Sequence, residues 1–233
     1  MTNDVLDLEL SNEFISSHTR KRIYKLLKRS SDILFGLIGF LVLIPTTIIV
    51  KILYMLTGDF DKVIFVQERI GLNGKTFRLY KYRTMVPNAD KILMKILKKK
   101  KKLAKEYKKN KKLKNDPRIT KIGKFLRKAS IDELPQMINI LKGDMSLIGN
   151  RPYLPRERED MGVYYEAIIE TKPGLTGYWQ VGGRSDTTFE TRLKMEKYYS
   201  EHAGFRIDIK IFLKTFKVVL GRHGAEWCWI YTI

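Results

Sequence analysis

The sequence predicts an α+β fold that is mostly α, with a membrane-inserted re-entrant helix and a small cytosolic domain that carries a β-hairpin and surface amphipathic helices. Three observations lead to this fold class. The run Ile33 to Val50 is apolar, residues 62–85 alternate with a period of two, and the later segments carry apolar residues at helical spacing. At 233 residues the chain can bury one good core.

The net charge of +20 calls for an anionic partner or surface, and its position narrows the choice. Between Met85 and Lys128 there are 18 Lys and Arg residues against three acids, so this window supplies +15 of the total. The single cysteine, Cys228, excludes an internal disulfide framework and fits a reducing compartment. We expect no cleavable secretory signal, because the first thirty residues are polar and the apolar run is too long.

The N-terminal part divides into a lead and a membrane segment. Residues 1–19 are mixed and acidic and predict a flexible lead or a short helix. Residues 20–57 join a basic cluster, Arg20 to Arg29, to the apolar run. Thirteen of the run's eighteen residues are Leu, Ile, Phe or Val, so insertion gains on the order of 4–8 kcal/mol. The segment is therefore predicted to enter a membrane.

Whether this helix crosses the membrane depends on Pro45. As a helix the run is ~27 Å long, only just enough for a hydrocarbon core of ~30 Å. Pro45 removes a backbone donor and disfavours the α conformation at Ile44, and the hydroxyls of Thr46 and Thr47 can satisfy the carbonyls that a break would free. Basic residues lie on both sides, against the positive-inside tendency. We expect a helix that bends near Pro45 and returns to the same face; the alternative is a kinked span.

The next segment has the pattern of a β-hairpin. Val63 to Val66 and Thr76 to Tyr82 flank a glycine-rich turn at residues 71–74. In the second strand Lys81 falls on the same face as the apolar Leu79. An inward lysine is usually a snorkelling side chain, but beside a carboxylate pair it can hold a phosphate.

Residues 85–115 predict a helical segment dominated by lysine. Such blocks of like charge are most often solvated faces. Beside a membrane helix each Lys or Arg gains about 1 kcal/mol near anionic lipid. We interpret the segment as a lipid contact, and RNA binding is the alternative.

Two adjacent carboxylates, Asp132 and Glu133, lie within the most basic half of the chain. Ser130 followed by Glu133 is a capping-box pattern, and the helix is expected to begin either there or at Pro135. Both carboxylates would lie near the positive end of the helix dipole, with Arg127 upstream, which favours their ionised form. A helix cap and a charged catalytic tool both stay open on these residues alone.

The remaining segments have structural interpretations. Gly143 suits the C′ position that ends the short helix. Residues 186–199 predict a structural helix. Residues 207–220 predict an amphipathic helix that either lies on the membrane or packs on the core, with Ile209 among its apolar face. The tail, 223–233, is aromatic and has no assigned role.

Five sequence blocks, in this order, resemble the bacterial sugar transferases, which are monotopic polyprenyl-phosphate phosphoglycosyltransferases. The resemblance covers roughly residues 20–222 and makes 58–222 the catalytic domain. The blocks are Gln67 to Met85, Asp116 to Arg127, Asp132 to Gln136, Lys142 to Pro152, and Lys172 to Gln180.

The resemblance implies the chemistry. Asp132 would attack the β-phosphate of a nucleoside diphosphate sugar, a UDP-hexose by this resemblance, and carry the phosphosugar covalently. Polyprenyl phosphate, in this family undecaprenyl phosphate, would then accept it. Glu133, with Asp132, would hold Mg²⁺, which offsets the repulsion between an anionic nucleophile and a diphosphate. Initiation of capsule or exopolysaccharide repeat units would be the role.

The resemblance also implies the substrate-binding residues. Arg127 would grip phosphate with two parallel hydrogen bonds. Lys81 and Arg83 match cations beside the site. Further contacts are implied for Arg151, Pro152, Gln180 and Arg184.

Two positions depart from the family pattern. The Ser-Pro pair at which the family often bends its membrane helix reads Ile44-Pro45 here, and the common Pro-Arg-Pro reads Asn150-Arg151-Pro152. The second variant is associated with the hexose-1-phosphate branch. We expect the chain to be the catalytic unit alone, without the spanning helices of longer relatives.

The resemblance places the protein on the cytoplasmic face of the bacterial inner (plasma) membrane, in contact with membrane lipids and without a nucleic-acid partner. A homodimer stays open. The rival from another class is a membrane-anchored protein that binds nucleic acid or anionic lipid through its lysines and performs no catalysis.

Overall fold

The computed structural model describes residues 2–110, 113, 115–182 and 187–220, so the tail 223–233 lies outside the described residues. Its elements confirm the α+β, mostly α fold. In chain order they are α1 (Thr2–Leu56), β1 (Ile64–Ile70), η1 (Leu72–Gly74), β2 (Thr76–Tyr82), α2 (Ala89–Lys99), α3 (Lys101–Asn110), α4 (Lys121–Lys128), η2 (Ile131–Gln136), α5 (Met137–Lys142), β3 (Ser146–Ile148), η3 (Pro155–Glu157), α6 (Arg158–Met161), η4 (Gly162–Tyr164), α7 (Tyr165–Ile169), β4 (Gly174–Thr176), α8 (Tyr178–Gly182), α9 (Phe189–His202) and α10 (Phe205–Leu220).

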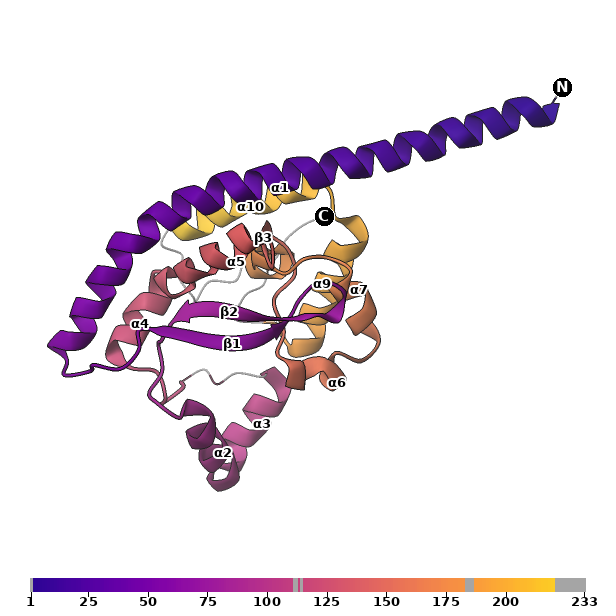
Figure 1. Cartoon of the computed structure of the whole chain (residues 1–233). Helices are drawn as coiled ribbons and strands as arrows, with labels where there is room; N and C mark the ends of the chain where they lie inside the picture. Colours follow the sequence, from indigo (N-terminus) through magenta and orange to yellow (C-terminus); the bar gives the residue numbers. More distant parts are fainter. Residues whose placement is uncertain (1, 111–112, 114, 183–186, 221–233) are drawn as a thin grey trace.

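Helix α1 continues through Pro45 without a break. The hydroxyl of Thr46 donates to the carbonyl of Val42, and that of Thr47 to the carbonyl of Leu43, each at 2.7 Å, so side chains bond the backbone beside the proline. The later part of α1 curves around the domain (Figure 1). Of the expected lead, residues 1–19, the described residues 2–19 form the first turns of the same helix. Return of the helix to the same membrane face stays a prediction.

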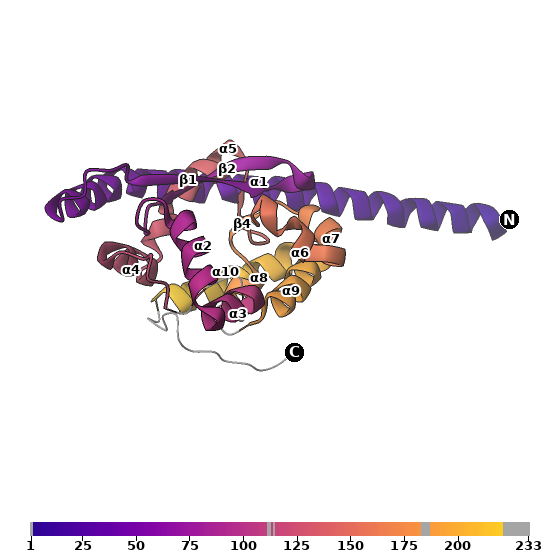
Figure 2. The same cartoon turned by 90° about the horizontal axis from the view of Figure 1, so that it is seen from below.

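The apolar surface of α1 is largely uncovered. By length and composition, Lys21–Leu56 is the one candidate membrane span within the described part of the chain. Large apolar side chains along it are exposed, and a folded domain rarely leaves so long an apolar stripe in water. They include Leu34, Leu37, Leu41, Ile44, Ile48 and Leu56. Figure 2 shows α1 reaching beyond the domain at both of its ends.

The hairpin β1–β2 forms as the alternation predicts. Its register pairs Phe65 with Lys81 and Gln67 with Leu79. Leu79 and Tyr82 are buried, and Lys81 lies on the same face of β2 as Leu79. This face carries η2, which brings the carboxylate pair over the strand.

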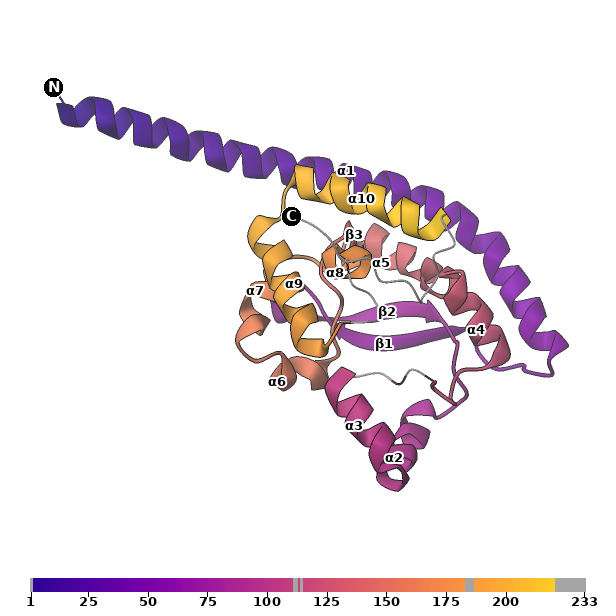
Figure 3. The same ribbon diagram turned by 180° about the vertical axis from the view of Figure 1, so that it is seen from behind.

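A second, parallel pair, β3–β4, joins Ser146 to Gly174 and Ile148 to Thr176. Helix α10 lies beside α1 on this side of the domain (Figures 1 and 3). It buries Ile211, while Ile209, which we predicted on the apolar face, is exposed.

Helix α10 packs on the core, which is one of the two alternatives that the sequence leaves open, and its contact with a membrane stays a prediction. Phe212 packs against Phe35 of α1 with ring centroids 5.3 Å apart. Leu213 and Phe216 remain exposed, and the ring of Phe216 lies 4.8 Å from that of Phe212. Packing on α1 thus leaves part of the apolar surface of α10 uncovered.

The lysine-rich segment is helical, as predicted, and forms α2 and α3. The two helices project from the domain on the side away from α10 (Figures 1 and 3). Their contact with lipid stays a prediction.

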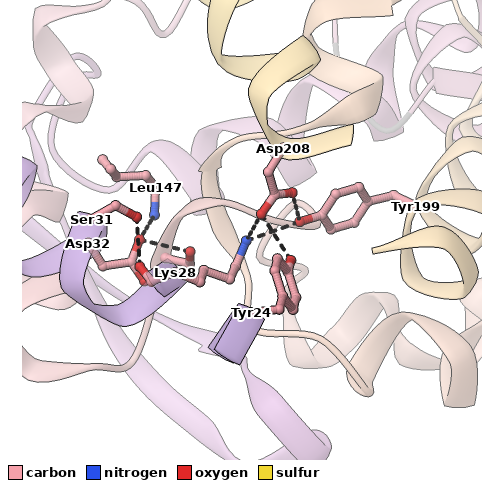
Figure 4. A network of polar contacts seen from close by, with 8 residues as sticks. Tyr24, Lys28, Ser31, Asp32, Leu147, Tyr199 and Asp208 are labelled. Carbon is pink, nitrogen blue, oxygen red and sulfur yellow. Dashed lines mark hydrogen bonds and ion pairs between the residues drawn. The ribbon is translucent and has the colours of Figure 1, made fainter. Parts of the chain in front are cut away.

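A polar network fastens α1 to the C-terminal helices (Figure 4). Lys28 of α1 forms an ion pair with Asp208 of α10 at 2.5 Å. Tyr24 donates a hydrogen bond to the same carboxylate at 2.9 Å, and Tyr199 of α9 donates one at 2.8 Å. Residues separated by some 180 positions thus hold the membrane helix on the domain.

Candidate active site

The carboxylate pair lies on η2, a short 3-10 helix between α4 and α5. Ser130 adopts a left-handed conformation, with φ 56°, and its side chain makes no capping hydrogen bond. The predicted capping box is therefore wrong, because Ser130 lies in a left-handed conformation and its side chain caps no backbone N–H. Pro135 lies inside η2, and α5 begins at Met137 rather than at Ser130 or Pro135. Gly143, with φ 85°, ends α5 as expected.

The two carboxylates occupy different environments. Asp132 is buried, with 9 % of its surface exposed. Glu133 forms an ion pair with Lys81 of β2 at 2.7 Å. The inward lysine thus reaches the carboxylate pair, as the alternation of β2 suggested.

The pKa of Asp132 is raised above its ordinary value. Burial is the main cause, followed by the charge of neighbouring Glu133, while Lys81 and Arg127 act in the opposite direction. We expected the helix dipole and the upstream cations to favour the ionised form. Arg127 does act in that direction, but the loss of solvent and the charge of Glu133 outweigh the nearby cations.

Arg127 stands beside the pair on α4. Its Nε donates to the hydroxyl of buried Thr84 at 2.9 Å, a bond that orients the guanidinium without using its terminal nitrogens. Its charge acts on Asp132. This placement suits a group that binds phosphate next to the carboxylates.

Arg83 directly follows β2 and is held by partners outside the pocket. It donates to the carboxylate of Asp59 at 2.8 Å and to the carbonyl of Lys62 at 2.9 Å, and its guanidinium lies 4.7 Å from the Tyr54 ring centroid. The structure does not bring Arg83 into the pocket beside Glu133. Its contact with substrate stays a prediction.

A pocket opens beside Glu133 and collects most of the other predicted residues. Five of its lining residues were predicted as site residues from the sequence: Lys81, Glu133, Arg151, Pro152 and Gln180. They come from β2, η2, the turn after β3, and α8. Gln180 donates to the carbonyl of Leu175 at 2.9 Å. Arg184 lies outside the described residues.

Two lining residues, Arg69 and Gln136, were not predicted as site residues. Arg69 donates to the carbonyl of Pro152 at 3.0 Å and to the side chain of Gln67 at 2.6 Å. Burial, with the charge of Arg151 as a second cause, lowers the pKa of Arg69 to about 10. Both residues belong to the family blocks, and this was the only sequence signal for them.

Three buried donors around the pocket lack an acceptor within the part of the chain that the structure describes. They are Nε of Arg69, Nε2 of Gln136 and Nε of Arg151. Unsatisfied buried donors are costly, and a ligand rich in acceptors relieves that cost. Three donors and Lys81 together suit a diphosphate.

Buried side chains hold the Arg151 turn from behind. Glu196 accepts a hydrogen bond from the backbone N–H of Arg151 at 3.0 Å. Asn150 donates to Ile168, Thr171 and Ser200 at 2.6 to 3.2 Å. Asn150, which replaces the family's usual proline, is thus a buried residue that hydrogen-bonds the turn to the segments behind it.

The carboxylate pair fits one way in which proteins bind magnesium. Among the described residues there is no group of three or more His, Cys, Asp or Glu side chains that could enclose a metal. Mg²⁺, however, is commonly held by one or two carboxylates together with substrate phosphates. Asp132 and Glu133 provide that donor set, beside a pocket that suits phosphates.

Fold and site together define a membrane-associated protein with a carboxylate and cation site for an anionic substrate. The family description "Bacterial sugar transferase" matches residues 23–222. The chain belongs to this family.

Several curated proteins are similar to it. The chain is 41% identical over 211 residues to the undecaprenyl-phosphate galactose phosphotransferase of Salmonella typhimurium, a match that covers 91% of the chain and 44% of that protein. It is 36% identical over 198 residues to the exopolysaccharide production protein ExoY of Sinorhizobium fredii, covering 85% and 87% respectively. The UDP-N-acetylgalactosamine-undecaprenyl-phosphate N-acetylgalactosaminephosphotransferase of Aeromonas hydrophila is 34% identical over 212 residues, covering 88% and 46%. The chain spans less than half the length of the first and third relatives.

Proposed function

We propose that the protein transfers a sugar-1-phosphate from a nucleoside diphosphate sugar to polyprenyl phosphate through a covalent intermediate on Asp132, as the first step of surface polysaccharide assembly. The observation that carries the proposal is the buried Asp132 next to Glu133, whose ion pair with Lys81 lines a pocket where buried donors lack acceptors among the described residues. The names of the relatives support a UDP-sugar donor and undecaprenyl phosphate as the acceptor.

In the first half-reaction a carboxylate oxygen of Asp132 attacks the β-phosphorus of the donor. A new bond joins that oxygen to phosphorus, the bond from phosphorus to the bridging oxygen breaks, and nucleoside monophosphate leaves with the electron pair. Arg69, Lys81 and Arg151 hold the diphosphate against the nucleophile, and Arg127 supports the charge that builds on phosphorus.

In the second half-reaction an oxygen of the lipid phosphate attacks the same phosphorus. The bond to Asp132 breaks and returns a free carboxylate, and the product is a polyprenyl diphosphate sugar. This division into two steps predicts ping-pong kinetics. Mg²⁺ bound by Glu133 and Asp132 would neutralise phosphate charge.

The setting follows from the chemistry. A water-borne donor and a lipid phosphate can meet only at the head-group level, and α1 carries an exposed apolar surface into the bilayer. We place the site at the cytoplasmic face of the bacterial inner membrane, with α1 as a monotopic, re-entrant helix. The rival, a membrane-anchored protein that binds nucleic acid or anionic lipid through its lysines and performs no catalysis, predicts no transfer in the experiment below.

A labelled donor tests the proposal. Purified protein is incubated with a UDP-hexose labelled in the sugar, Mg²⁺ and undecaprenyl phosphate, and we expect label in the lipid phase and an adduct at Asp132 by mass spectrometry. Asp132→Asn should abolish both, because an amide is a poor nucleophile. Asp61→Asn, at an exposed aspartate, is the control. Full turnover by Asp132→Asn would contradict the assignment.

A further inference from the structure

Helix α1 holds the C-terminal end of the segment that carries the carboxylates. The guanidinium of Arg29 donates to the carbonyl of Ile140 at 2.7 Å and to that of Leu141 at 2.8 Å. These carbonyls belong to the last turn of α5, where a helix leaves its acceptors unpaired and favours a cation. One side chain of the membrane helix thus caps the helix that follows η2.

Asp32 lies one turn after Arg29 on α1 and binds the next element, strand β3. Asp32 is buried, with 3 % of its surface exposed, and its Oδ1 accepts bonds from the hydroxyl of Ser146 at 2.9 Å and from the backbone N–H of Leu147 at 2.8 Å. Figure 4 shows Asp32 facing Leu147. Arg29 therefore binds the end of α5 and Asp32 binds β3, on the two sides of the short connection between these elements.

Two glycines bring the helices into close contact. A Cβ added at Gly36 would lie 2.9 Å from Cδ2 of Leu141, and one added at Gly39 would lie 2.6 Å from Cγ of Met137. Residues spaced three and four apart share one face of a helix, so both glycines continue the face of Arg29 and Asp32. The backbone of α1 lies directly against α5 along this face.

We propose that this contact sets the position of the catalytic carboxylates relative to the lipid surface, with Arg29 and Asp32 as positioning residues. The inference rests on the function proposed above. Met137 begins α5 directly after η2, so a shift of α5 along α1 carries Asp132 with it.

The contacts of the pocket itself lie within the domain. The ion pair of Glu133 is with Lys81 of β2, and Arg127 is oriented by Thr84, so neither contact uses α1. Loosening the contact between α1 and α5 should therefore disturb the meeting with the membrane acceptor more than the binding of the soluble donor.

The two half-reactions separate these effects. Arg29→Gln is compared with wild type and with Lys25→Gln, which removes an exposed cation from the same region of α1. Each protein is placed in nanodiscs prepared with and without undecaprenyl phosphate. Release of nucleoside monophosphate without acceptor reports the first step, and transfer to lipid reports the second.

For Arg29→Gln we expect transfer to the lipid to fall at least about tenfold, the size of effect that loss of charge-assisted hydrogen bonds produces. Monophosphate release, and transfer to a short-chain polyprenyl phosphate dissolved in detergent, should change less than about twofold. Lys25→Gln should behave as wild type.

A second variant guards against a folding defect. Gly39→Val pushes against Met137 and should give the same selective loss, and Gly39→Val with Met137→Ala should restore transfer by making room. Equal loss in both half-reactions, or no loss in either, would overturn the proposal. A wild-type protein that releases no monophosphate and forms no adduct would instead contradict the proposed function, and this inference with it.

Discussion

At the scale of single residues the site is decided by opposing effects on one carboxylate. Burial and the charge of Glu133 raise the pKa of Asp132, while Lys81 and Arg127 lower it. In the proposed mechanism the nucleophile must be ionised, so the cations would have a catalytic use besides binding substrate. Substitution of Glu133 should lower the pKa of Asp132, and substitution of Lys81 should raise it.

The first residue-scale prediction concerns Glu133. The rate of monophosphate release should rise with pH through the raised pKa of Asp132, because only the ionised form attacks. Glu133→Gln removes a like charge, so the rising limb should move to lower pH even though the maximal rate falls. The pH profile of the first half-reaction measures this shift. Glu68→Gln, at an exposed position on β1, should leave the limb in place.

The second residue-scale prediction concerns Lys81. Lys81→Met removes a cation that lowers the pKa of Asp132, so the rising limb should move to higher pH. The maximal rate should also fall by about 10- to 100-fold, the range for loss of one electrostatic contact to the reacting group. Lys75→Met, at an exposed lysine near the start of β2, is the matched control. A limb that moves to lower pH would show that Lys81 does not face the ionised aspartate.

At the scale of elements, helix α4 is held against the end of the hairpin by a glycine. A Cβ added at Gly123 would lie 2.0 Å from the carbonyl oxygen of Thr84. The backbone of α4 thus lies directly against the backbone of Thr84, with no flexible side chain between them. The same Thr84 orients Arg127 through its hydroxyl. The approach of α4 thus also places a residue of the site.

We predict that Gly123→Ala destabilises the protein by about 3 kcal/mol, because neither backbone can yield without moving α4. Denaturant unfolding measures the loss. The variant should also slow the first half-reaction, since Arg127 moves with its helix. Lys124→Ala, exposed on the same helix, should change stability by less than about 0.5 kcal/mol. Unchanged stability of Gly123→Ala would mean that α4 lies further from Thr84.

Helix α9 supports the pocket from behind. Glu196 is buried on it and accepts the backbone N–H of Arg151. Glu196→Ala should leave that donor unsatisfied, destabilise the protein by about 1–3 kcal/mol and raise the KM for the donor more than it lowers kcat. Glu190→Ala, exposed on the same helix, is the control. An unaltered KM would separate Glu196 from the pocket.

At the scale of the whole molecule, the membrane helix and the domain form one folded unit. Lys28 of α1 meets Asp208 of α10, with Tyr24 and Tyr199 on the same carboxylate. These bonds join opposite parts of the sequence next to the contact between α1 and α5. Loss of the network should therefore loosen the attachment of α1 as well as α10.

We predict that Asp208→Ala destabilises the protein by about 3–5 kcal/mol, because it leaves Lys28 charged and without its partner. The double variant Lys28→Met with Asp208→Leu should recover most of the loss, since an apolar pair needs no desolvation. Thermal unfolding in detergent compares the two, with Lys210→Ala on α10 as control. No recovery in the double variant would show that the network does more than pair two charges.

The sequence by itself determined the features that depend on neighbours along the chain. The apolar run of α1, the alternation that places Lys81 beside Leu79 and the glycine that ends α5 all follow from local spacing. The family blocks predicted Asp132 and Glu133 as the reactive pair. These predictions needed no knowledge of what packs against what.

Only the tertiary structure decided the features that depend on burial and on distant partners. The raised pKa of Asp132 comes from loss of solvent, and the pocket donors Arg69 and Gln136 gain their meaning from the elements folded around them. The grip of α1 on α5 joins residues more than 100 positions apart. Spacing along a chain records neither solvent loss nor such contacts, because both arise when separate segments meet.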